Sequence, residues 1–332
     1  MTKQTRKTKA KTTKRSAKGR KKATYRIRNW AAYNQNLVRR GSITLWVSEE
    51  VIENWHPQAE GVRARGGQVL YSDQAIECLL MLRAVYQLPY RQAEGFGQAV
   101  IDLLGADVIV PDYTTLCKRS PELTVSLSAS QTNEAKHIVV DSTGLKIYGE
   151  GEWKVRQHGY SKRRTWRKLH LSVDAATHEI QALALTEVSI DDAEAGKQLV
   201  EDTPGEIEQV SGDGSYDKGK FYDACTVRQV KCIAIPPRRD AKIWQHGNSK
   251  KAPLPRDQNL RRIRQVGRNR WKQEAGYHRR SLAETAVFRF KMIFGNTMSA
   301  RTLPRQITEA CIKGAALNRM TQLGMPDSYR VA

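Results

Sequence analysis

The sequence predicts an α/β protein with an RNase H-like mixed five-stranded sheet and flanking helices. A helical, helix-turn-helix-like region and a disordered basic arm are expected to precede the sheet. Three observations predict this order: basic residues dominate the first 28 positions, apolar residues then recur at helical spacing, and β-branched apolar runs begin at residue 137. The expected divisions are an arm at 1–28, a helical region at 29–125 and a sheet domain at 135–325.

The composition narrows the class of protein. The chain has 332 residues, a formal net charge of +22 and a pI near 9.9, which indicates a polyanionic partner. It contains no apolar run of the roughly 18 residues that a membrane span needs, and no apolar stretch of a secretory signal follows the first residues. Cys225 and Cys232 are separated by six residues, which is not a zinc spacing, so the five cysteines are expected to be reduced thiols in a cytoplasmic protein.

The positive charge is concentrated in two segments. Residues 1–28 contain 13 Lys and Arg and no acidic residue, and they have too few apolar side chains to order themselves. Such an arm suits phosphate binding through counterion release, with a solubilising tail as the alternative. Residues 238–291 carry +12, whereas residues 29–237 carry −6. The interior excess therefore also indicates an anion-binding surface.

The region after the arm contains residues that commonly begin or end helices. Ser72 or Asp73 can cap a first helix, Pro89 begins a second that Gly105 ends, and Asp112 can cap a short third helix. Three short helices with small polar and basic residues at the start of the last resemble a helix-turn-helix, with a supporting helical bundle as the alternative. The residues expected to contact DNA here are Thr114, Thr115, Lys118 and Arg119.

The second half changes period. Strands are predicted at 137–147, 167–175, 180–188, 206–214 and 231–237, with helices at 191–202 and 218–230 between the later ones. A basic connection at 238–268 leads to a long helix at about 269–294, and a last helix follows at 304–322. Three consecutive strands followed by alternating helices and strands is the RNase H-like order, in which the first and fourth strands are neighbours.

Two aspartates occupy strand positions where an acidic side chain is costly unless it is paired or binds a metal. Asp141 lies inside the first strand and Asp213 at the end of the fourth, so the sheet would place them face to face. Like charges so close favour a divalent cation, and oxygen ligands suit Mg²⁺. On the long helix, Tyr277, Arg280, Glu284 and Lys291 project within a stripe of roughly 60° at about 100° per residue.

These residues together predict phosphodiester chemistry. Asp141, Asp213 and Glu284 could hold two Mg²⁺ ions, with Mn²⁺ as a substitute, about 3.5–4 Å apart. One ion would activate a water or a 3′-hydroxyl, and the other would stabilise the leaving oxygen. Arg280 and Lys291 would neutralise phosphates, and Tyr277 would contact a sugar, a base or a phosphate.

The Y-x₂-R-x₃-E-x₆-K pattern of these four helix residues resembles the signature of bacterial insertion-sequence DDE transposases, specifically insertion sequence family five. The segments VVDSTGLKIYGEGEW, RRTWRKLHLSVD and SGDGSYDKGKFY look like the acidic motifs of that group. YSDQAIECLLMLRAVYQLPYRQAEGF and PDYTTLCKR resemble its amino-terminal DNA-binding region. The similarity covers about residues 55–320.

The resemblance implies a metal-dependent transposase that binds terminal inverted repeats, hydrolyses the 3′ phosphodiester at the element ends and transfers strands into target DNA. By motif, Asp141, Asp213 and Glu284 take the catalytic and metal-ligand roles, and Tyr277, Arg280 and Lys291 contact DNA. The expected partners are double-stranded DNA and a second copy in a homodimeric paired-end complex, with no membrane and no nucleotide cofactor. The expected location is the bacterial cytoplasm, at the nucleoid. The alternatives are a non-catalytic DNA-binding regulator and an RNase H-like nuclease without strand transfer.

Other residues compete for roles. Glu274 is a rival third ligand, and Asp217 is expected to cap a helix rather than bind metal. Trp244 and Trp271 could stack on an extruded base, although core packing is the better expectation. The basic hairpin around 156–170 could contact DNA through Arg163, Arg164 and Lys168, with solvated charge as the equal alternative.

Overall fold

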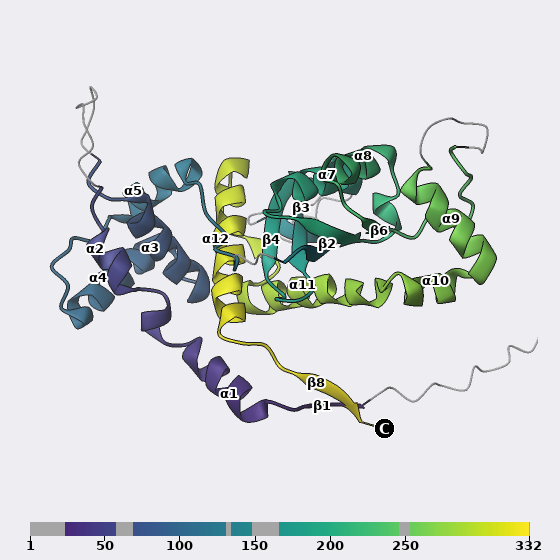
Figure 1. Ribbon diagram of the computed structural model, residues 1–332. Coiled ribbons are helices and arrows are strands. Elements are labelled where there is room, and N and C mark those ends of the chain that lie inside the picture. Colours follow the sequence, from purple (N-terminus) through teal and green to yellow (C-terminus); the bar gives the residue numbers. More distant parts are fainter. Residues whose placement is uncertain (1–23, 58–68, 131–133, 148–165, 246–252, 332) are drawn as a thin grey trace, which may run out of the picture.

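The computed structural model describes residues 24–57, 69–130, 134–147, 166–245 and 253–331. Figure 1 shows a central sheet with helices on both faces, an N-terminal group of helices beside α12, and an arm made from the two chain ends. The prediction of a mixed α/β fold with a mixed sheet and flanking helices is confirmed. None of the described helices is long and apolar enough to cross a membrane.

The sheet follows the predicted strand order. Its strands are β2 (Lys136–Ile147), β3 (Trp166–Asp174), β4 (Ile180–Glu187), β5 (Ile207–Ser211) and β6 (Cys232–Ala234). They lie in the order β4-β3-β2-β5-β6, with β2, β3 and β4 antiparallel and β2, β5 and β6 parallel. The first and fourth strands, β2 and β5, are therefore neighbours, as expected. A sixth strand, β7 (Thr297–Met298), pairs with β2; it was missed because two residues carry no strand periodicity.

Alternation along β2 separates two apolar clusters. Ile138 and Val140 pack in the cluster that contains α7 (Asp192–Asp202) and α8 (Gly219–Val227). Val139 and Leu145 pack in the cluster that contains α11 (Ser281–Phe294) and α12 (Leu303–Gln322). Because successive side chains on a strand point to opposite faces, Asp141 shares the α11 face with Val139.

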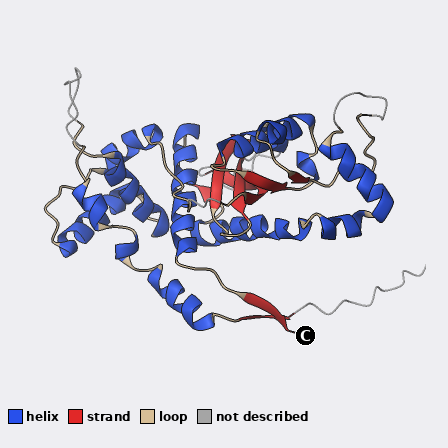
Figure 2. Ribbon diagram, viewed as in Figure 1, coloured by secondary structure: helices blue, strands red, loops and turns tan. Residues whose placement is uncertain are grey.

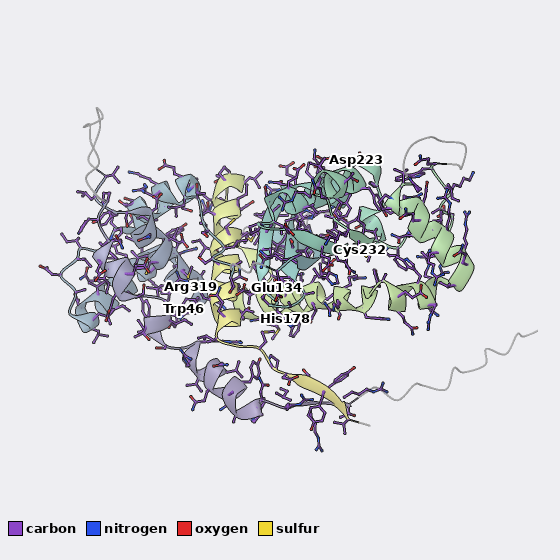
Figure 3. The ribbon with its side chains drawn as sticks, in the orientation of Figure 1. Trp46, Glu134, His178, Asp223, Cys232 and Arg319 are labelled. Atoms are coloured by element: carbon purple, nitrogen blue, oxygen red, sulfur yellow. The ribbon has the colours of Figure 1, made fainter. Side chains whose placement is uncertain are left out.

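The N-terminal helices pack on the same core as the α11 face. Ser72 accepts a hydrogen bond from the Ala75 amide at the start of α3 (Asp73–Val85), and Gly105 closes α4 (Tyr90–Leu104) in the left-handed region. Asp112 caps α5 (Tyr113–Arg119), as predicted. Before them lie α1 (Trp30–Arg39) and α2 (Glu49–Glu53), in a stretch that the sequence left unassigned. Figure 3 shows Trp46 beside Arg319 of α12, whose guanidinium donates to the Trp46 carbonyl at 3.5 Å.

The single long helix predicted at 269–294 is wrong. The segment forms α10 (Arg268–Glu274), a 3₁₀ turn η5 (Tyr277–Arg280) and then α11. Gly276 has φ +59°, a left-handed backbone conformation that ends α10 and that glycine adopts without steric strain. Helical periodicity continues across the break, so the pattern alone did not show it.

The predicted basic connection at 238–268 also contains a helix. α9 (Pro255–Val266) begins with a proline at its first position and ends at Gly267, which has φ +83°. The sequence of α9 is so rich in arginine that it has little apolar periodicity. Local start and stop signals were therefore better guides than hydropathy in this segment.

The two chain ends meet in a separate ribbon. β1 (Thr24–Ile27) pairs antiparallel with β8 (Ser328–Val331), and Figure 2 shows this ribbon away from the main sheet. Residues 24–27 belong to the arm predicted to be disordered at 1–28, so that prediction is wrong for them; residues 1–23 lie outside the described residues. Disorder was expected because the arm lacks apolar residues, but its pairing partner lies some 300 residues away along the chain.

Candidate active site

Asp141 lies on β2, on the sheet face covered by α11. Val139 pairs with Ser211 in the parallel β2–β5 ladder, so two residues further on Asp141 and Asp213 leave neighbouring strands in the same direction. Among the described residues, the Asp141 carboxylate accepts a hydrogen bond only from the adjacent Ser142 amide, at 2.9 Å. The position therefore combines partial burial with few hydrogen-bond donors.

Asp213 begins the short 3₁₀ turn η4 (Gly214–Tyr216) that follows β5. Its carboxylate accepts from the Ser215 amide at 2.8 Å and from the Ser215 hydroxyl. The turn thus fixes the side chain at the carboxyl end of the strand, where the sheet places it toward Asp141.

Glu284 lies in the first turn of α11, and 56% of its side chain is exposed. Arg280, one turn earlier, forms an ion pair with it. Both residues come from the segment after the Gly276 break, so the orientation of the pair is set by the start of α11 rather than by one continuous helix.

The electrostatics of Asp141 bring these groups together. Burial raises the pKa of Asp141, and the negative charges of Asp213 and Glu284 raise it further. The Ser142 amide and the Arg280 guanidinium act in the opposite direction. Burial also lowers the pKa of Arg280, but neighbouring Tyr277, Glu284 and Asp141 more than offset it. The three carboxylates and the arginine therefore lie close enough to influence one another electrostatically, and a cation is the ligand that the carboxylate charges favour.

Lys291 contacts β2 close to Asp141. Its ammonium donates to the Thr143 hydroxyl at 2.6 Å, and burial lowers the pKa of Lys291. Thr143 lies two residues after Asp141 and so shares its face of the sheet. Thr143 and Ser215 were not predicted to lie at the site, although each follows a predicted aspartate by two residues, and that spacing was a usable signal for both.

Tyr277 lies beside the site but is buried. Only 8% of it is exposed, its ring centroid is 6.1 Å from that of Trp271, and the Lys272 ammonium lies 5.0 Å from its ring centre. The structure therefore places Tyr277 in the packing that supports η5. Of the four stripe residues, Arg280, Glu284 and Lys291 present polar atoms toward β2, and Tyr277 supports them.

The rival acids are engaged elsewhere. Glu274 accepts from Arg262 at 2.9 Å and from Arg270 at 3.2 Å. Asp217 accepts from Arg256 at 2.8 Å and from the Tyr222 hydroxyl at 3.2 Å. The expectation that Asp217 caps a helix is wrong, because Lys218 holds the N-cap position of α8 and the Asp217 carboxylate turns to the buried arginine instead.

The two tryptophans differ in exposure. Trp271 is 2% exposed and its indole N–H donates to Asn259 at 3.2 Å, so core packing is confirmed for it. Trp244 is 46% exposed, and the Arg256 guanidinium lies 3.8 Å from its ring centre. The expectation of core packing is therefore wrong for Trp244, whose ring stacks on the Arg256 guanidinium near the protein surface.

The DNA-contact residues expected in the helical region have mixed environments. The Thr114 and Thr115 hydroxyls donate to the capping Asp112 carboxylate at 2.6 and 3.2 Å. Arg119 bonds to Asp73 and to the Tyr71 carbonyl, which ties α5 to α3. Lys118 is exposed.

Lys168, expected to contact DNA from the basic hairpin, is not part of the α11-side site. Its ammonium donates to the Ile190 carbonyl at 2.9 Å and pairs with Asp192 at 3.2 Å, at the start of α7. Arg163 and Arg164 lie outside the described residues.

The donor set fits a hard divalent cation by its chemistry. Asp141, Asp213 and Glu284 offer carboxylate oxygens, which Mg²⁺ and Mn²⁺ accept. Within the described ranges, however, no three His, Cys, Asp or Glu side chains are gathered closely enough to hold a metal ion. The Glu284 carboxylate instead pairs with Arg280.

Two family models, each described as a transposase DDE domain, match residues 38–150 and 132–319. Among solved structures, the chain is similar to the piggyBac transposase synaptic complex with hairpin DNA, with 11% identity and a TM-score of 0.38. That overlap covers 85% of this chain and 75% of the other.

Proposed function

Because this chain belongs to the DDE transposase family, we propose that Asp141, Asp213 and Glu284 are the catalytic carboxylates of an insertion-sequence transposase. The chain is a transposase, and the family implies dependence on a divalent metal ion. The proposed reaction is hydrolysis of the 3′ phosphodiester at the element ends, followed by transfer of those ends into target DNA. We also propose that the transposase belongs to insertion sequence family five and that its sheet is RNase H-like. Its proposed location is the bacterial nucleoid.

One observation carries the assignment: a half-buried Asp141 on β2 faces Asp213, Glu284 and Arg280, and burial together with both acids raises its pKa. A buried carboxylate with like-charged neighbours is unfavourable in a purely structural role. Such a cluster is a functional-site candidate because a bound cation or reacting group would relieve the repulsion.

The metal that the family implies would be held by the three carboxylates. Two Mg²⁺ ions, with Mn²⁺ as a substitute, would supply an activated water or 3′-hydroxyl and stabilisation of the leaving oxygen. The protein side chains orient the DNA around this centre. Arg280 offers a planar guanidinium for a phosphate, and Lys291, braced on Thr143, offers a point charge on the same face.

The N-terminal helices are the proposed reader of the terminal inverted repeats. α3, α4 and α5 would form a helix-turn-helix-like unit, with the exposed Lys118 on α5 directed to DNA. Thr114, Thr115 and Arg119 support α5 through Asp112 and Asp73, so in DNA binding they would orient the helix as well as contact the backbone. Tyr277, Arg163, Arg164 and Lys168 remain proposed DNA contacts, and a homodimer remains the proposed form of the paired-end complex.

The test is DNA cleavage with mapped ends. Purified protein would be incubated with Mg²⁺ and a plasmid carrying the DNA that natively flanks its reading frame, beside an Asp141→Asn variant. Asp223→Asn is the matched control, because Asp223 is an exposed carboxylate on α8, on the other side of the sheet (Figure 3). The proposal requires nicks at corresponding sites on both flanks with wild type and Asp223→Asn, and none with Asp141→Asn.

Binding to the flanks without cleavage in Mg²⁺ or Mn²⁺ would instead support a non-catalytic regulator. Cleavage without any joined product in the presence of target DNA would support a nuclease. Undiminished cleavage by Asp141→Asn would refute the site assignment itself.

A further inference from the structure

The ribbon formed by the two chain ends is built to stay together. In the β1–β8 register Tyr25 lies opposite Arg330, and Arg26 lies opposite Tyr329. The Arg28 amide extends the pairing by donating to the Asp327 carbonyl at 2.7 Å. Asn29 closes it, because its carboxamide donates to the Met325 carbonyl at 3.1 Å and accepts from the Asp327 amide at 2.8 Å.

The ribbon nevertheless covers no core. Tyr25 is 61% exposed and Tyr329 is 40% exposed, and α1, which follows β1, contains no buried residue. An isolated two-stranded ribbon is only marginally stable in water. Because this ribbon exposes large aromatic side chains to solvent, we expect it to bind a partner.

Both faces of the ribbon carry the same chemistry. Residues directly opposite each other in an antiparallel pair lie on the same face, so one face presents Tyr25 with Arg330 and the other presents Arg26 with Tyr329. Neither strand contains an acidic residue. Within the part of the chain that the structure describes, Arg26 and Arg330 have no ion-pair partner, whereas Arg28 pairs with Asp327 at 3.5 Å.

Charge selects the partner. The sequence before β1 contains eleven Lys and Arg and no acid, so the base of the ribbon continues into strongly positive chain. Edge-to-edge pairing with a second copy would place these like charges together, whereas duplex DNA complements them. The major groove is wide enough for a two-stranded ribbon, and Arg and Tyr can donate to phosphates or base edges there.

We propose that the β1–β8 ribbon is a DNA-binding element, separate from α5 and from the carboxylate site, in which Arg26 and Arg330 contact the phosphates of duplex DNA. The inference rests on the proposed function in one respect, namely that the substrate is DNA. In Figure 1 the ribbon and α1 run on the side of α11 rather than on the α7–α8 side. Arg289 of α11 is electrostatically close to Arg40, at the end of α1. When DNA is bound at the α11 face, the ribbon would therefore contact duplex DNA away from the phosphodiester that reacts.

The experiment measures affinity and its salt dependence. Fluorescence anisotropy with a duplex of about 40 base pairs would compare wild type with Arg26→Ala/Arg330→Ala over a KCl series. Loss of two phosphate contacts should weaken binding about tenfold at low salt and reduce the slope of log K against log [KCl] by about 2. The control is Lys197→Ala/Lys231→Ala, which removes the same charge from α7 and from the connection between α8 and β6, and it should stay within about twofold of wild type.

Equal affinities and slopes for wild type and the ribbon variant would overturn the proposal. So would a change from dimer to monomer, measured by sedimentation, that accounts for the whole loss of affinity, because the ribbon would then bind a second copy. Failure of wild type to bind any duplex would instead refute the proposed function. A thermal unfolding curve of the ribbon variant that matches wild type would show that the loss is local.

Discussion

Two groups of charged side chains in this molecule, the arginines of α9–α10 and the carboxylates around Asp141, differ in how many hydrogen bonds they make to the protein. The basic block at α9–α10 is rich in arginine, but its arginines are largely bonded to the protein. Arg256 pairs with the buried Asp217, and Arg262 pairs with Glu274. The preceding segment is held through its carbonyls: Arg261 donates to Gln245, Arg264 to Ala241 and Arg268 to Pro237.

The carboxylate site has the opposite character. Within the described part of the chain, the Asp141 carboxylate accepts one hydrogen bond, from its neighbour Ser142, and the half-exposed Glu284 pairs with Arg280 one turn away. The number of charged residues in a segment therefore does not show whether their side chains stabilise the fold or are available to bind a ligand. Their hydrogen-bond partners and their burial do show it.

The largest expected effect is the loss of cleavage in Asp213→Asn and Glu284→Gln. Each substitution removes one negative charge from the cluster around Asp141 while retaining the shape of the side chain. We expect cleavage to fall at least about 1000-fold, equivalent to about 4 kcal/mol in activation free energy, with DNA binding within about threefold of wild type. Single-turnover cleavage and anisotropy measure the two quantities. A modest change in cleavage for both variants would remove them from the catalytic site.

The next largest effect is a loss of stability when an arginine that is ion-paired within the protein is replaced. Arg256→Met leaves the Asp217 carboxylate buried without its partner, because both side chains are at most 5% exposed. We expect unfolding free energy to fall by about 3–5 kcal/mol. Denaturant unfolding measures it, and the double variant Arg256→Met/Asp217→Asn should recover part of the loss. A loss below about 1 kcal/mol would show that this pair does not fasten α9.

A smaller effect comes from the raised pKa of Asp141. A carboxyl with a folded-state pKa above its unfolded value binds protons more strongly when folded, so stability falls as pH rises through that window. Without metal, Asp141→Asn should therefore stabilise the protein and raise its Tm at pH 7, and the gain should disappear at about pH 3, where the carboxyl is protonated in both states. Thermal scans in chelator at both pH values test this. Equal destabilisation at both pH values would contradict the electrostatic cause.

The smallest effect is expected for Arg280→Gln on stability. The Arg280 and Glu284 side chains are 27% and 56% exposed and lie one helical turn apart, so loss of the pair should change the unfolding free energy by no more than about 0.5 kcal/mol. The same variant should lower DNA cleavage much more than it lowers stability, because the guanidinium is proposed to bind phosphate. A stability loss as large as that of Arg256→Met would place Arg280 among the fastening residues.

Much of the architecture could be predicted because its signals are local. Ser72, Gly105 and Asp112 mark helix ends through backbone hydrogen bonds made within a few residues. The strands β2, β3 and β4 were found from β-branched apolar runs. The neighbouring placement of Asp141 and Asp213 followed from strand order, since it needs only the adjacency of β2 and β5.

Other features depended on partners that no local pattern names. The break at Gly276 interrupts a continuous helical periodicity, and the sequence does not state which sign of φ its glycine takes. Asp217 looked like a helix cap until Arg256, 39 residues later, was found beside it. Arg119 resembled a DNA contact, but its guanidinium reaches back to α3.

The sequence by itself determined the family, the order of helices and strands, and the acids that share one face of the sheet, because residue type and spacing carry that information. Only the tertiary structure decided which charges are already satisfied, and it alone joined Thr24–Ile27 to Ser328–Val331. The physical reason is that a hydrogen bond or ion pair depends on distance in space. Residues hundreds of positions apart meet only after the core has packed and brought their backbones together.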